Sequence, residues 1–431
     1  MSDLVQTRPW RRATFWLLVL TVFFFLSYGL ATWITAQRTD VGSAVFAWER
    51  HIPFLPWTII PYWSIDVLYG LSLFICTTPR ELDTHARRLL TAQITAVSCF
   101  ILLPLTFAFP RPEPDGIAGL LFEALGKFDK PFNQAPSLHI ALLVILWDRF
   151  ARHIPSWSGP LVHGWFALIG ISVLTTYQHH FLDIPTGVLL GFVCIWLWPE
   201  DMLGPLSQIS ITANPKRRRL AAYYAAGAVI LGLLAIGWGG TALWLLWPAV
   251  SLFLVAANYA MLGPMGFQKT EDGAMSLAAR WLFAPYLVGA WLNSRAWTYS
   301  APNPVEVVDE VFLGRFPSRH DAAAFPSVVD LCAELPRPER WRAGGGSVWR
   351  SIPMLDLIPP EPALVQQAAE AIEQARARGP VLVCCALGYG RSAAAAAGWL
   401  LVTGRARDLA AANDQIRAVR PKVVLRDPAG E

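Results

Sequence analysis

The sequence predicts a polytopic α-helical membrane domain, with about eight transmembrane helices, followed by a soluble α/β domain. Of the 431 residues, 54% are hydrophobic and only 15% are charged, whereas about a quarter of the residues of a soluble globular protein are charged. The deficit is uneven, because long apolar runs fill residues 14–298 and residues 303–431 have an ordinary soluble composition. Many of the 20 Trp residues flank the apolar runs, as in the aromatic belts at lipid headgroups.

The individual spans follow from the length of the apolar runs, because a helix that crosses a bilayer needs about 20 mostly apolar residues. The first run is too long for the core of a signal peptide, so we expect it to be retained as a helix. Eight runs are predicted to span: 14–36, 55–76, 89–110, 137–150, 161–178, 184–199, 219–239 and 242–262.

Orientation follows from the basic residues, because cytoplasmic loops are enriched in Lys and Arg. If every helix spans, one side of the membrane receives all the basic loops, and the loops at 111–136 and 179–183 face outward. We therefore expect a multi-pass protein of a cell membrane, of the bacterial inner-membrane type, whose C-terminal domain is cytoplasmic. The basic residues are Arg8, Arg11, Arg12, Arg80, Arg87, Arg88, Arg149, Arg152 and Lys216 to Arg219.

A ninth run at 275–298 is ambiguous. Its uninterrupted apolar core, Trp281 to Leu292, has 12 residues, which is below spanning length and favours a helix lying in the membrane interface. If this run spans instead, the C-terminal domain moves to the outside. The predicted divisions are a six-helix membrane domain at 1–200, two more helices and the interfacial helix at 201–298, a linker at 299–306 and the soluble domain at 307–431.

The soluble domain alternates apolar strands with helical stretches, which is typical of a layered α/β fold. Strands are predicted at Val311 to Leu313, Val328 to Leu331, Val348 to Met354 and Val381 to Cys384. Helices are predicted at Pro362 to Arg378 and near 391–403 and 407–419.

The end of the last predicted strand carries a pattern suited to phosphate chemistry. Cys385 is followed after five residues by Arg391 and Ser392, which begin a helix. Backbone N–H groups at a helix N-terminus lower a thiol pKa and cradle phosphate oxygens, and Gly388 and Gly390 let the loop curl tightly. Arg391 can clamp phosphoryl oxygens in bidentate fashion, and Ser392 can donate to the leaving sulfur.

A general acid is also required for the leaving oxygen. Asp356 lies on a loop after a predicted strand, 29 positions before Cys385, and is the candidate. Cys-x5-Arg by itself is a weak signal, because a buried Cys and an unrelated Arg would produce it by chance. The preceding strand, the following helix, the two glycines and Ser392 together favour the catalytic interpretation.

These residues resemble the dual-specificity branch of the protein tyrosine phosphatase superfamily over about 303–428. The resemblance includes Val311-Phe-Leu-Gly-Arg and Ile416-Arg-Ala-Val-Arg-Pro421 as well as the Asp356 and Cys385 loops. It implies that Cys385 forms a phosphocysteine, that Arg391 clamps the phosphate and that Asp356 is the acid. One position departs from the family, because Cys384 stands where a His usually precedes the nucleophile. A reversible link between the two cysteines is disfavoured, because neighbouring cysteines bond poorly without strain.

A second set of candidate residues lies in the membrane domain. Ser137 and His139 open the fourth predicted span, and His179 and Asp183 lie between the fifth and the sixth. Antiparallel neighbouring helices would bring both ends to the same outer face. His179 and Asp183 are four residues apart, so a helical turn places them on one side, where the carboxylate orients the imidazole. His180 has no carboxylate four residues later. A His at a helix end is often only a cap, but polar groups near lipid are costly and mark functional sites.

These residues resemble the type-2 phosphatidic acid phosphatase superfamily, especially its inositolphosphotransferase-like branch, over roughly 60–200. The resemblance implies that His179 attacks phosphorus, that Asp183 orients it and that His139 protonates the leaving alkoxide. Ser137 and Arg111 would bind phosphate. Two cations of the family pattern are missing, because Pro104 and Val173 stand where Lys and Arg are usual. Lys127 and Lys130, in the same outer loop as Arg111, are candidates to replace them.

The leading prediction is a bifunctional membrane phosphatase, with one site for hydrolysis or phosphotransfer of lipid phosphates and one for hydrolysis of phosphomonoesters of a phospholipid or a phosphoprotein. The alternative is a protein phosphatase anchored by an inactive, lipid-binding membrane domain. A non-catalytic transporter with a phosphate-sensing tail is disfavoured by the completeness of the Cys385 loop. The six Cys lack the spacing of a zinc site or disulfide framework, and no metal or cofactor is predicted. The net charge of +4 is too modest to indicate a nucleic-acid partner; membrane lipids are the expected partners.

Overall fold

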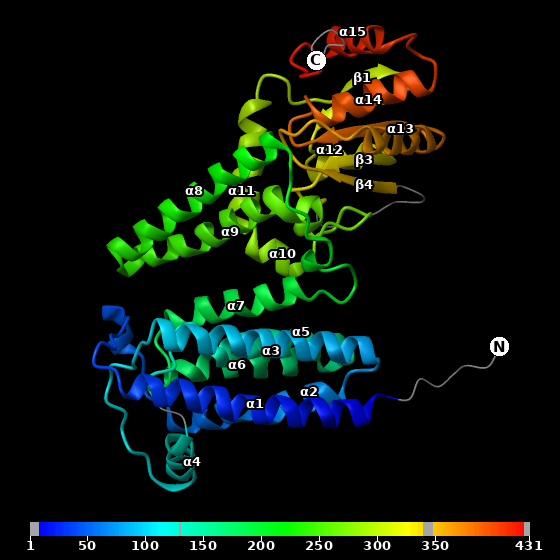
Figure 1. Cartoon of the computed structure of the whole chain (residues 1–431). Coiled ribbons are helices and arrows are strands. Elements are labelled where there is room, and N and C mark those ends of the chain that lie inside the picture. The colour runs from blue at the N-terminus through cyan, green and yellow to red at the C-terminus, as the bar shows by residue number, and fades with distance from the viewer. Residues whose placement is uncertain (1–7, 129–130, 339–347, 426–431) are drawn as a thin grey trace, which may run out of the picture. The chain divides into compact units, whose positions relative to one another are not determined.

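The chain forms two compact units, Met1–Gly204 and Pro205–Glu431, drawn as a cartoon in Figure 1. The computed structural model describes residues 8–128, 131–338 and 348–425. Because the placement of one unit relative to the other is not determined, each is described by itself.

The first unit is a helical bundle with one short helix, α4, beside it (Figure 1). Its buried apolar core is drawn from α1, α2, α3, α5, α6 and α7. α4 contributes Phe122 and Leu125 to that core. The helices are α1 (Trp10–Ala36), α2 (Ile59–Phe74), α3 (Pro79–Leu102), α4 (Gly116–Phe128), α5 (Leu138–His153), α6 (Gly159–Thr175) and α7 (Asp183–Leu197).

Two glycines on α7 bring this helix against α5. A Cβ atom at Gly187 would lie 2.6 Å from the carbonyl oxygen of Ser137, and one at Gly191 would lie 2.7 Å from Cβ of Val144. Only residues without a side chain permit such close approach of two helix backbones. The Ser137 N–H also donates to the carbonyl oxygen of Asp183 at 3.2 Å. The N-terminal ends of α5 and α7 are therefore held side by side.

Among the described residues, four helical stretches are long and apolar enough to cross a membrane: Trp10–Ala36, Ser156–Thr175, Pro215–Trp238 and Gly240–Phe267. Two belong to each unit. α7 is apolar but only 15 residues long, and α3 begins with a charged segment. The protein is thus mostly helical with four candidate spans, half the number that the apolar runs of the sequence predict.

The second unit begins with a helical hairpin. α8 (Pro215–Trp238) packs against α9 (Leu246–Ala257), which continues into a π-helical turn at Asn258–Leu262. The run at 275–298, predicted to be one interfacial helix, forms two helices, α10 (Leu277–Leu282) and α11 (Ala284–Trp297). α11 is attached to the following domain, because Ser294 Oγ donates to the carbonyl oxygen of Ala386 at 2.5 Å.

The C-terminal part is a mixed five-stranded sheet in the order β1-β2-β5-β3-β4, antiparallel only between β1 and β2. All the predicted strands and helices of this part are confirmed; β1 was missed and begins inside the predicted linker. The elements are β1 (Val305–Val308), β2 (Val311–Arg315), α12 (Arg319–Ala323), β3 (Ser327–Cys332), β4 (Val348–Met354), α13 (Pro362–Arg376), β5 (Val381–Cys385), α14 (Arg391–Val402) and α15 (Leu409–Val419).

The alternation of side chains along β5 separates its two cysteines. Val381, Val383 and Cys385 belong to the apolar cluster that includes residues of α13 and α14, whereas Leu382 and Cys384 belong to the cluster on the other face. Successive side chains of a strand point to opposite faces. Cys385 is thus directed to the face of the central strand that the helices cover.

Candidate active sites

The loop between β5 and α14 bends sharply around the Cys385 sulfur. Gly388 has φ of +73°, and a Cβ atom there would lie 2.5 Å from the backbone of Gly314. Only Gly fits this position, because it tolerates both the positive φ and the close backbone approach. The Gly388 N–H donates to Sγ of Cys385 at 3.3 Å, and the Ser392 hydroxyl lies 3.2 Å from the same sulfur. The sulfur therefore lies among hydrogen-bond donors at the N-terminus of α14.

Arg391, the first residue of α14, is buried beneath this loop and held by two carboxylates. Its two terminal nitrogens contact Glu334 at 2.8 and 2.7 Å, and one of them also lies 2.9 Å from Asp356. The carbonyl oxygen of Met354 accepts a further bond. Among the described residues, Nε of Arg391 has no partner. An unsatisfied buried donor is costly, so this N–H is available to a phosphoryl oxygen.

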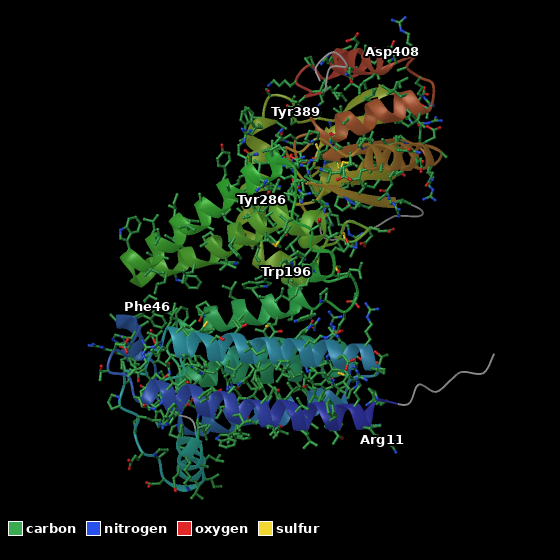
Figure 2. The ribbon with its side chains drawn as sticks, in the orientation of Figure 1. Arg11, Phe46, Trp196, Tyr286, Tyr389 and Asp408 are labelled. Atoms are coloured by element: carbon green, nitrogen blue, oxygen red, sulfur yellow. The ribbon has the colours of Figure 1, made fainter. Side chains whose placement is uncertain are left out.

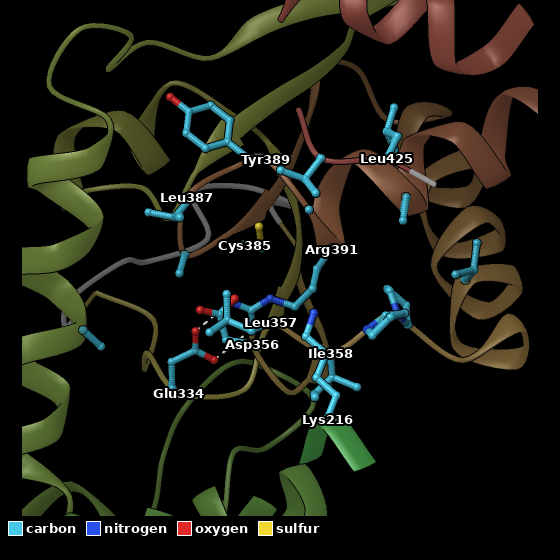
Figure 3. Close-up of a pocket in the computed structure, with 18 of the residues that line it drawn as sticks. Lys216, Glu334, Asp356, Leu357, Ile358, Cys385, Leu387, Tyr389, Arg391 and Leu425 are labelled. Carbon is cyan, nitrogen blue, oxygen red and sulfur yellow. Dashed lines mark hydrogen bonds and ion pairs between the residues drawn. The ribbon is translucent and has the colours of Figure 1, made fainter. Parts of the chain in front are cut away.

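Sequence reasoning missed Glu334, which follows β3. It is 3% exposed and forms a bidentate pair with Arg391 (Figure 3). Burial by itself would raise the pKa of Glu334, but the charge of Arg391 and the hydrogen bonds outweigh it and lower that pKa. A charged Glu334 fixes the guanidinium in one orientation. Glu334 is therefore a positioning residue, and a lone Glu after a buried strand gave no signal for it.

Asp356 lies on the loop after β4, close to Arg391 (Figure 3). Burial raises the pKa of its carboxyl group; the charge of Arg391 opposes this and Glu334 reinforces it. A raised pKa keeps the proton on the carboxyl group at higher pH, as a general acid requires. The structure thus brings Cys385, Arg391 and Asp356 to one pocket. Ser392 contacts the Cys385 sulfur, and Gly388 and Gly390 lie in the loop between them.

Replacing Asp356 by Asn is expected to lower kcat by about 10²–10⁴-fold with an alkyl phosphate, whose leaving oxygen needs a proton. In the wild-type protein, activity should fall as pH rises through the raised pKa of Asp356, because the acid loses its proton. The variant has no proton to lose there, so this alkaline limb should vanish. Profiles of kcat against pH for both proteins test the assignment; an unchanged alkaline limb in Asp356→Asn would contradict it.

The second candidate site lies where α5 and α7 begin. Nδ1–H of His179 donates to Oδ2 of Asp183 at 3.1 Å, so Nε2 carries the lone pair. The Ser137 hydroxyl lies 3.1 Å from this Nε2 and accepts the N–H of Ile140 at the start of α5. All three side chains are buried. The structure thus joins a buried imidazole nucleophile candidate to an orienting carboxylate and a hydroxyl.

His139 is the second residue of α5, and its ring stacks on Tyr62 with centroids 4.2 Å apart. Its Nε2 has no hydrogen-bond partner among the described residues. His180 is engaged on both sides: Nδ1 pairs with Glu49 at 2.9 Å, and Nε2 accepts the N–H of Ala108, also at 2.9 Å. His139 therefore keeps a nitrogen for proton transfer, whereas His180 and the buried Glu49, which sequence reasoning missed, have a structural role.

The predicted phosphate-binding cations make other contacts. The guanidinium of Arg111 lies over the ring of Phe122, 5.2 Å from its centroid. Lys127 pairs with Glu123 at 3.0 Å on an exposed face of α4. Both of these contacts are with residues of α4. Lys130 lies outside the described residues.

Phe46 marks the end of the bundle at which His179 lies, and Arg11 marks the opposite end (Figure 2). Phe46 and Trp48 contact Phe181, which follows the histidines. The site is therefore capped by aromatic side chains at the end remote from the basic N-terminus of α1.

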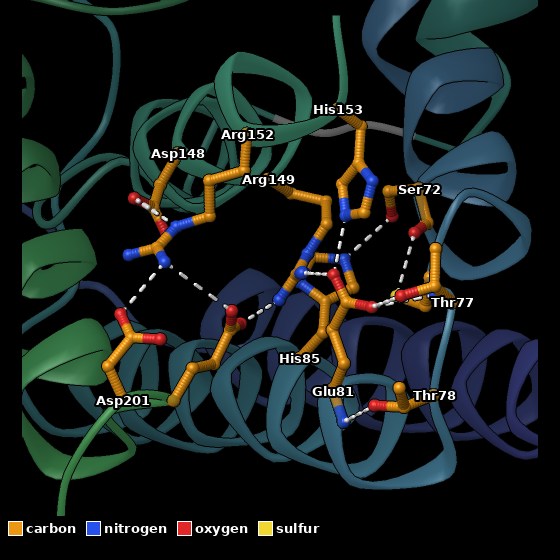
Figure 4. A network of polar contacts seen from close by, with 12 residues as sticks. Ser72, Thr77, Thr78, Glu81, His85, Asp148, Arg149, Arg152, His153 and Asp201 are labelled. Carbon is orange, nitrogen blue, oxygen red and sulfur yellow. Dashed lines mark hydrogen bonds and ion pairs between the residues drawn. The ribbon is translucent and has the colours of Figure 1, made fainter.

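A buried polar network occupies the other end of the bundle (Figure 4). Arg149 pairs with Glu81 and Glu200, and Arg88 pairs with Asp148 at 3.0 Å. Both arginines are at most 1% exposed. Buried charges are tolerated only when they are paired, so this network ties the ends of α3, α5 and α7 together. In the sequence analysis, Arg88 and Arg149 were assigned only to basic loops, and their carboxylate partners were missed.

Residues 86–203 match the model of the PAP2 superfamily. The solved structures similar to the chain include phosphatases. Human DUSP28 is 28% identical, covering 28% of this chain and 84% of that one, with a TM-score of 0.24. Tk-PTP in the active form is 23% identical, covering 29% of this chain and 88% of that one, with a TM-score of 0.24. PTPMT1 in complex with PI(5)P is 17% identical, covering 28% of this chain and 85% of that one, with a TM-score of 0.24. No curated protein matches.

Proposed function

We propose that the protein is a membrane phosphatase with two catalytic sites. The observation that carries the proposal is the Cys385 loop: the sulfur lies 3.3 Å from a backbone N–H and 3.2 Å from the Ser392 hydroxyl, beside an arginine with an unpaired buried Nε. This arrangement suits a phosphomonoester whose phosphoryl group enters the loop, and the ester can belong to a phospholipid or a phosphoprotein.

At the first site, the Cys385 thiolate attacks phosphorus and the bond from phosphorus to the ester oxygen breaks. Arg391 and the loop N–H groups stabilise the charge on the phosphoryl oxygens. Asp356 gives its proton to the leaving oxygen and, as a carboxylate, then removes a proton from water. That water attacks the phosphocysteine, the phosphorus–sulfur bond breaks, and inorganic phosphate and the thiolate are released, with Ser392 donating to the sulfur.

At the second site, Nε2 of His179 attacks the phosphorus of a lipid phosphate, and His139 gives a proton to the leaving alkoxide. Asp183 stabilises the cationic imidazole. Water, or an alcohol in the manner of the inositolphosphotransferase-like branch, then attacks the phosphohistidine and gives its proton to His139. The phosphorus–nitrogen bond breaks and frees His179. Neither step needs a metal or a cofactor.

The proposed topology has eight spans and both termini in the cytoplasm, where a thiolate enzyme is kept reduced. The His179 site then faces outward and membrane lipids are the partners. This topology rests on the distribution of basic residues and on four helices long and apolar enough to cross a membrane. The other four predicted spans would cross as helices of the first unit's bundle.

A second candidate function is a phosphatase whose membrane domain binds lipid without turning it over. Pro104 and Val173, which stand where cations are usual, and the exposed pairing of Lys127 with Glu123 favour this interpretation, because a phosphohistidine enzyme needs positive charge around the transferring phosphoryl group. In that case only the Cys385 site would release phosphate.

The test uses the purified full-length chain in detergent with two substrates, p-nitrophenyl phosphate and dioleoyl phosphatidate. We expect phosphate release from both, and we expect vanadate, a phosphate mimic, to block release from the aryl phosphate. Release from the aryl phosphate alone would favour the second candidate. No release from either substrate would contradict both.

A further inference from the structure

The pocket that contains Cys385 extends far beyond the phosphate loop. Its volume is about 1580 Å³, whereas small-molecule sites usually have about 300–1,000 Å³. One end is formed by Cys385, Arg391, Asp356 and Glu334. Figure 3 shows these residues around the loop, with Lys216 from the start of α8 on the same pocket. A phosphoryl group fills only a small part of this space.

The far wall of the pocket belongs to the helices that precede the phosphatase fold. Pro248 and Leu252 of α9, Tyr224 of α8, and Tyr286 and Gly289 of α11 line it. α8 and α9 lie in two of the four stretches long and apolar enough to cross a membrane. All of these residues belong to the same compact unit as Cys385. The pocket therefore joins a catalytic loop to helices with the composition of membrane spans.

The apolar wall is long enough for an acyl chain. The Tyr259 hydroxyl donates to the carbonyl oxygen of Asp356 at 3.0 Å, so this part of the hairpin lies at the catalytic end. Pro248 lines the pocket 11 residues earlier in the chain. At 1.5 Å per residue this is about 16 Å, close to the half-thickness of about 15 Å of a bilayer's hydrocarbon core.

The surface around the hairpin also fits a membrane substrate. Phe253, the neighbour of Leu252, is 62% exposed, and Leu233 of α8 is 66% exposed, as expected for side chains that face lipid. Lys216 opens α8 and begins a run of four basic residues that ends at Arg219. Basic residues at the end of a span attract anionic headgroups.

We propose that the Cys385 site acts on a membrane phospholipid whose headgroup carries a terminal phosphomonoester. The phosphoryl group enters the Cys385 loop and an acyl chain lies along Leu252 and Pro248, between α9 and α11. The proposal rests on the proposed function of this site and narrows its substrate from phosphomonoesters in general to lipids. The reaction is the one given above, with the lipid alkoxide as the leaving group that takes the proton of Asp356.

The test places larger side chains on the apolar wall of the pocket and leaves the residues of the phosphate loop unchanged. Nothing lies within 4 Å of a Cβ atom built at Gly289, so Gly289→Leu can project into the pocket without a backbone clash. Leu252→Trp narrows the wall from α9. The matched controls are their exposed neighbours, Val288→Leu on α11 and Phe253→Trp on α9, which are absent from the pocket wall.

The variants are made in the full-length His179→Ala chain, so that release by the membrane site does not contribute. The substrates are p-nitrophenyl phosphate, a phosphotyrosine peptide, and dioleoyl phosphatidate, phosphatidylglycerol phosphate and phosphatidylinositol phosphate in mixed micelles. We expect kcat/KM for at least one lipid to exceed that for the peptide by tenfold or more. Gly289→Leu and Leu252→Trp should each lower the ratio of lipid to aryl phosphate kcat/KM by tenfold or more, and the controls should change it less than twofold.

Three results would contradict the lipid proposal or the proposed function. If Cys385-dependent hydrolysis of the aryl phosphate is present but no lipid exceeds the peptide, the lipid proposal fails and the proposed function stands. If a lipid is preferred but pocket and control variants behave alike, the acyl chain does not lie along this wall and the proposal also fails. If no Cys385-dependent release occurs with any substrate, the proposed function itself fails.

Discussion

Replacing Cys385 by Ser is expected to abolish hydrolysis of p-nitrophenyl phosphate, lowering kcat by about 10⁴–10⁶-fold, as losses of enzymatic nucleophiles do. The physical reason is the nucleophile, because a sulfur nucleophile attacks phosphorus far more readily than an unactivated serine hydroxyl. The Gly388 N–H lies 3.3 Å from this sulfur. Arg391 and the loop are unchanged in the variant, so phosphate binding should survive without turnover.

The neighbouring cysteine supplies the control. Cys384 is fully buried and packs on the opposite face of the sheet, and both residues are free thiols. Cys384→Ala should therefore keep kcat within about threefold, a loss of well under 1 kcal/mol of transition-state stabilisation. Steady-state kinetics with the aryl phosphate and isothermal titration with vanadate separate turnover from binding. Turnover of Cys385→Ser at the wild-type rate would exclude a thiolate mechanism.

Replacing His179 by Ala should remove the lipid phosphate release that remains in a Cys385→Ser chain, by about 10³–10⁶-fold. The imidazole is the only group of this site with a lone pair held toward the Ser137 hydroxyl, at 3.1 Å, and with an orienting carboxylate at 3.1 Å on its other nitrogen. His180 cannot take its place, because both of its ring nitrogens are engaged, by Glu49 and Ala108.

Four proteins measure this effect with dioleoyl phosphatidate: wild type, Cys385→Ser, His179→Ala and the double variant. His163→Ala is the control, because that exposed imidazole only accepts a hydrogen bond from Trp147. If the Cys385→Ser chain releases no phosphate from the lipid, the membrane site is inactive. Equal release by Cys385→Ser and by the double variant would remove His179 from the mechanism.

Much of the C-terminal domain could be predicted because its signals are local. The strand at Val381–Cys385, the two loop glycines and the helix that begins at Arg391 are adjacent in sequence, and the structure places them as expected. His179 and Asp183 also pair as expected, although the turn that precedes α7, and not a helical turn, brings them together. The number of spans was less predictable, because hydropathy reports the length of an apolar run and not whether a shorter helix crosses a bilayer.

The partners of the catalytic groups could not be predicted in the same way. Glu334 lies 57 positions before Arg391, and Glu49 lies 131 positions before His180, so no spacing rule links them. For Arg111 and Lys127, nearness in sequence was a poor guide to contact. Both were expected in the outer loop beside the site, and their side chains contact Phe122 and Glu123 of α4.

The sequence by itself determined that an apolar, multi-helix region precedes an α/β domain, and that each carries the residue types of phosphoryl transfer. Periodicity, composition and short motifs depend only on residues that are close in sequence, so they can be recognised without knowledge of the fold. Only the tertiary structure decided how Arg391 is anchored and that α8, α9 and α11 extend the pocket of Cys385. Those contacts join distant segments whose packing is set by the whole unit, and they turn a general phosphatase loop into a candidate lipid site.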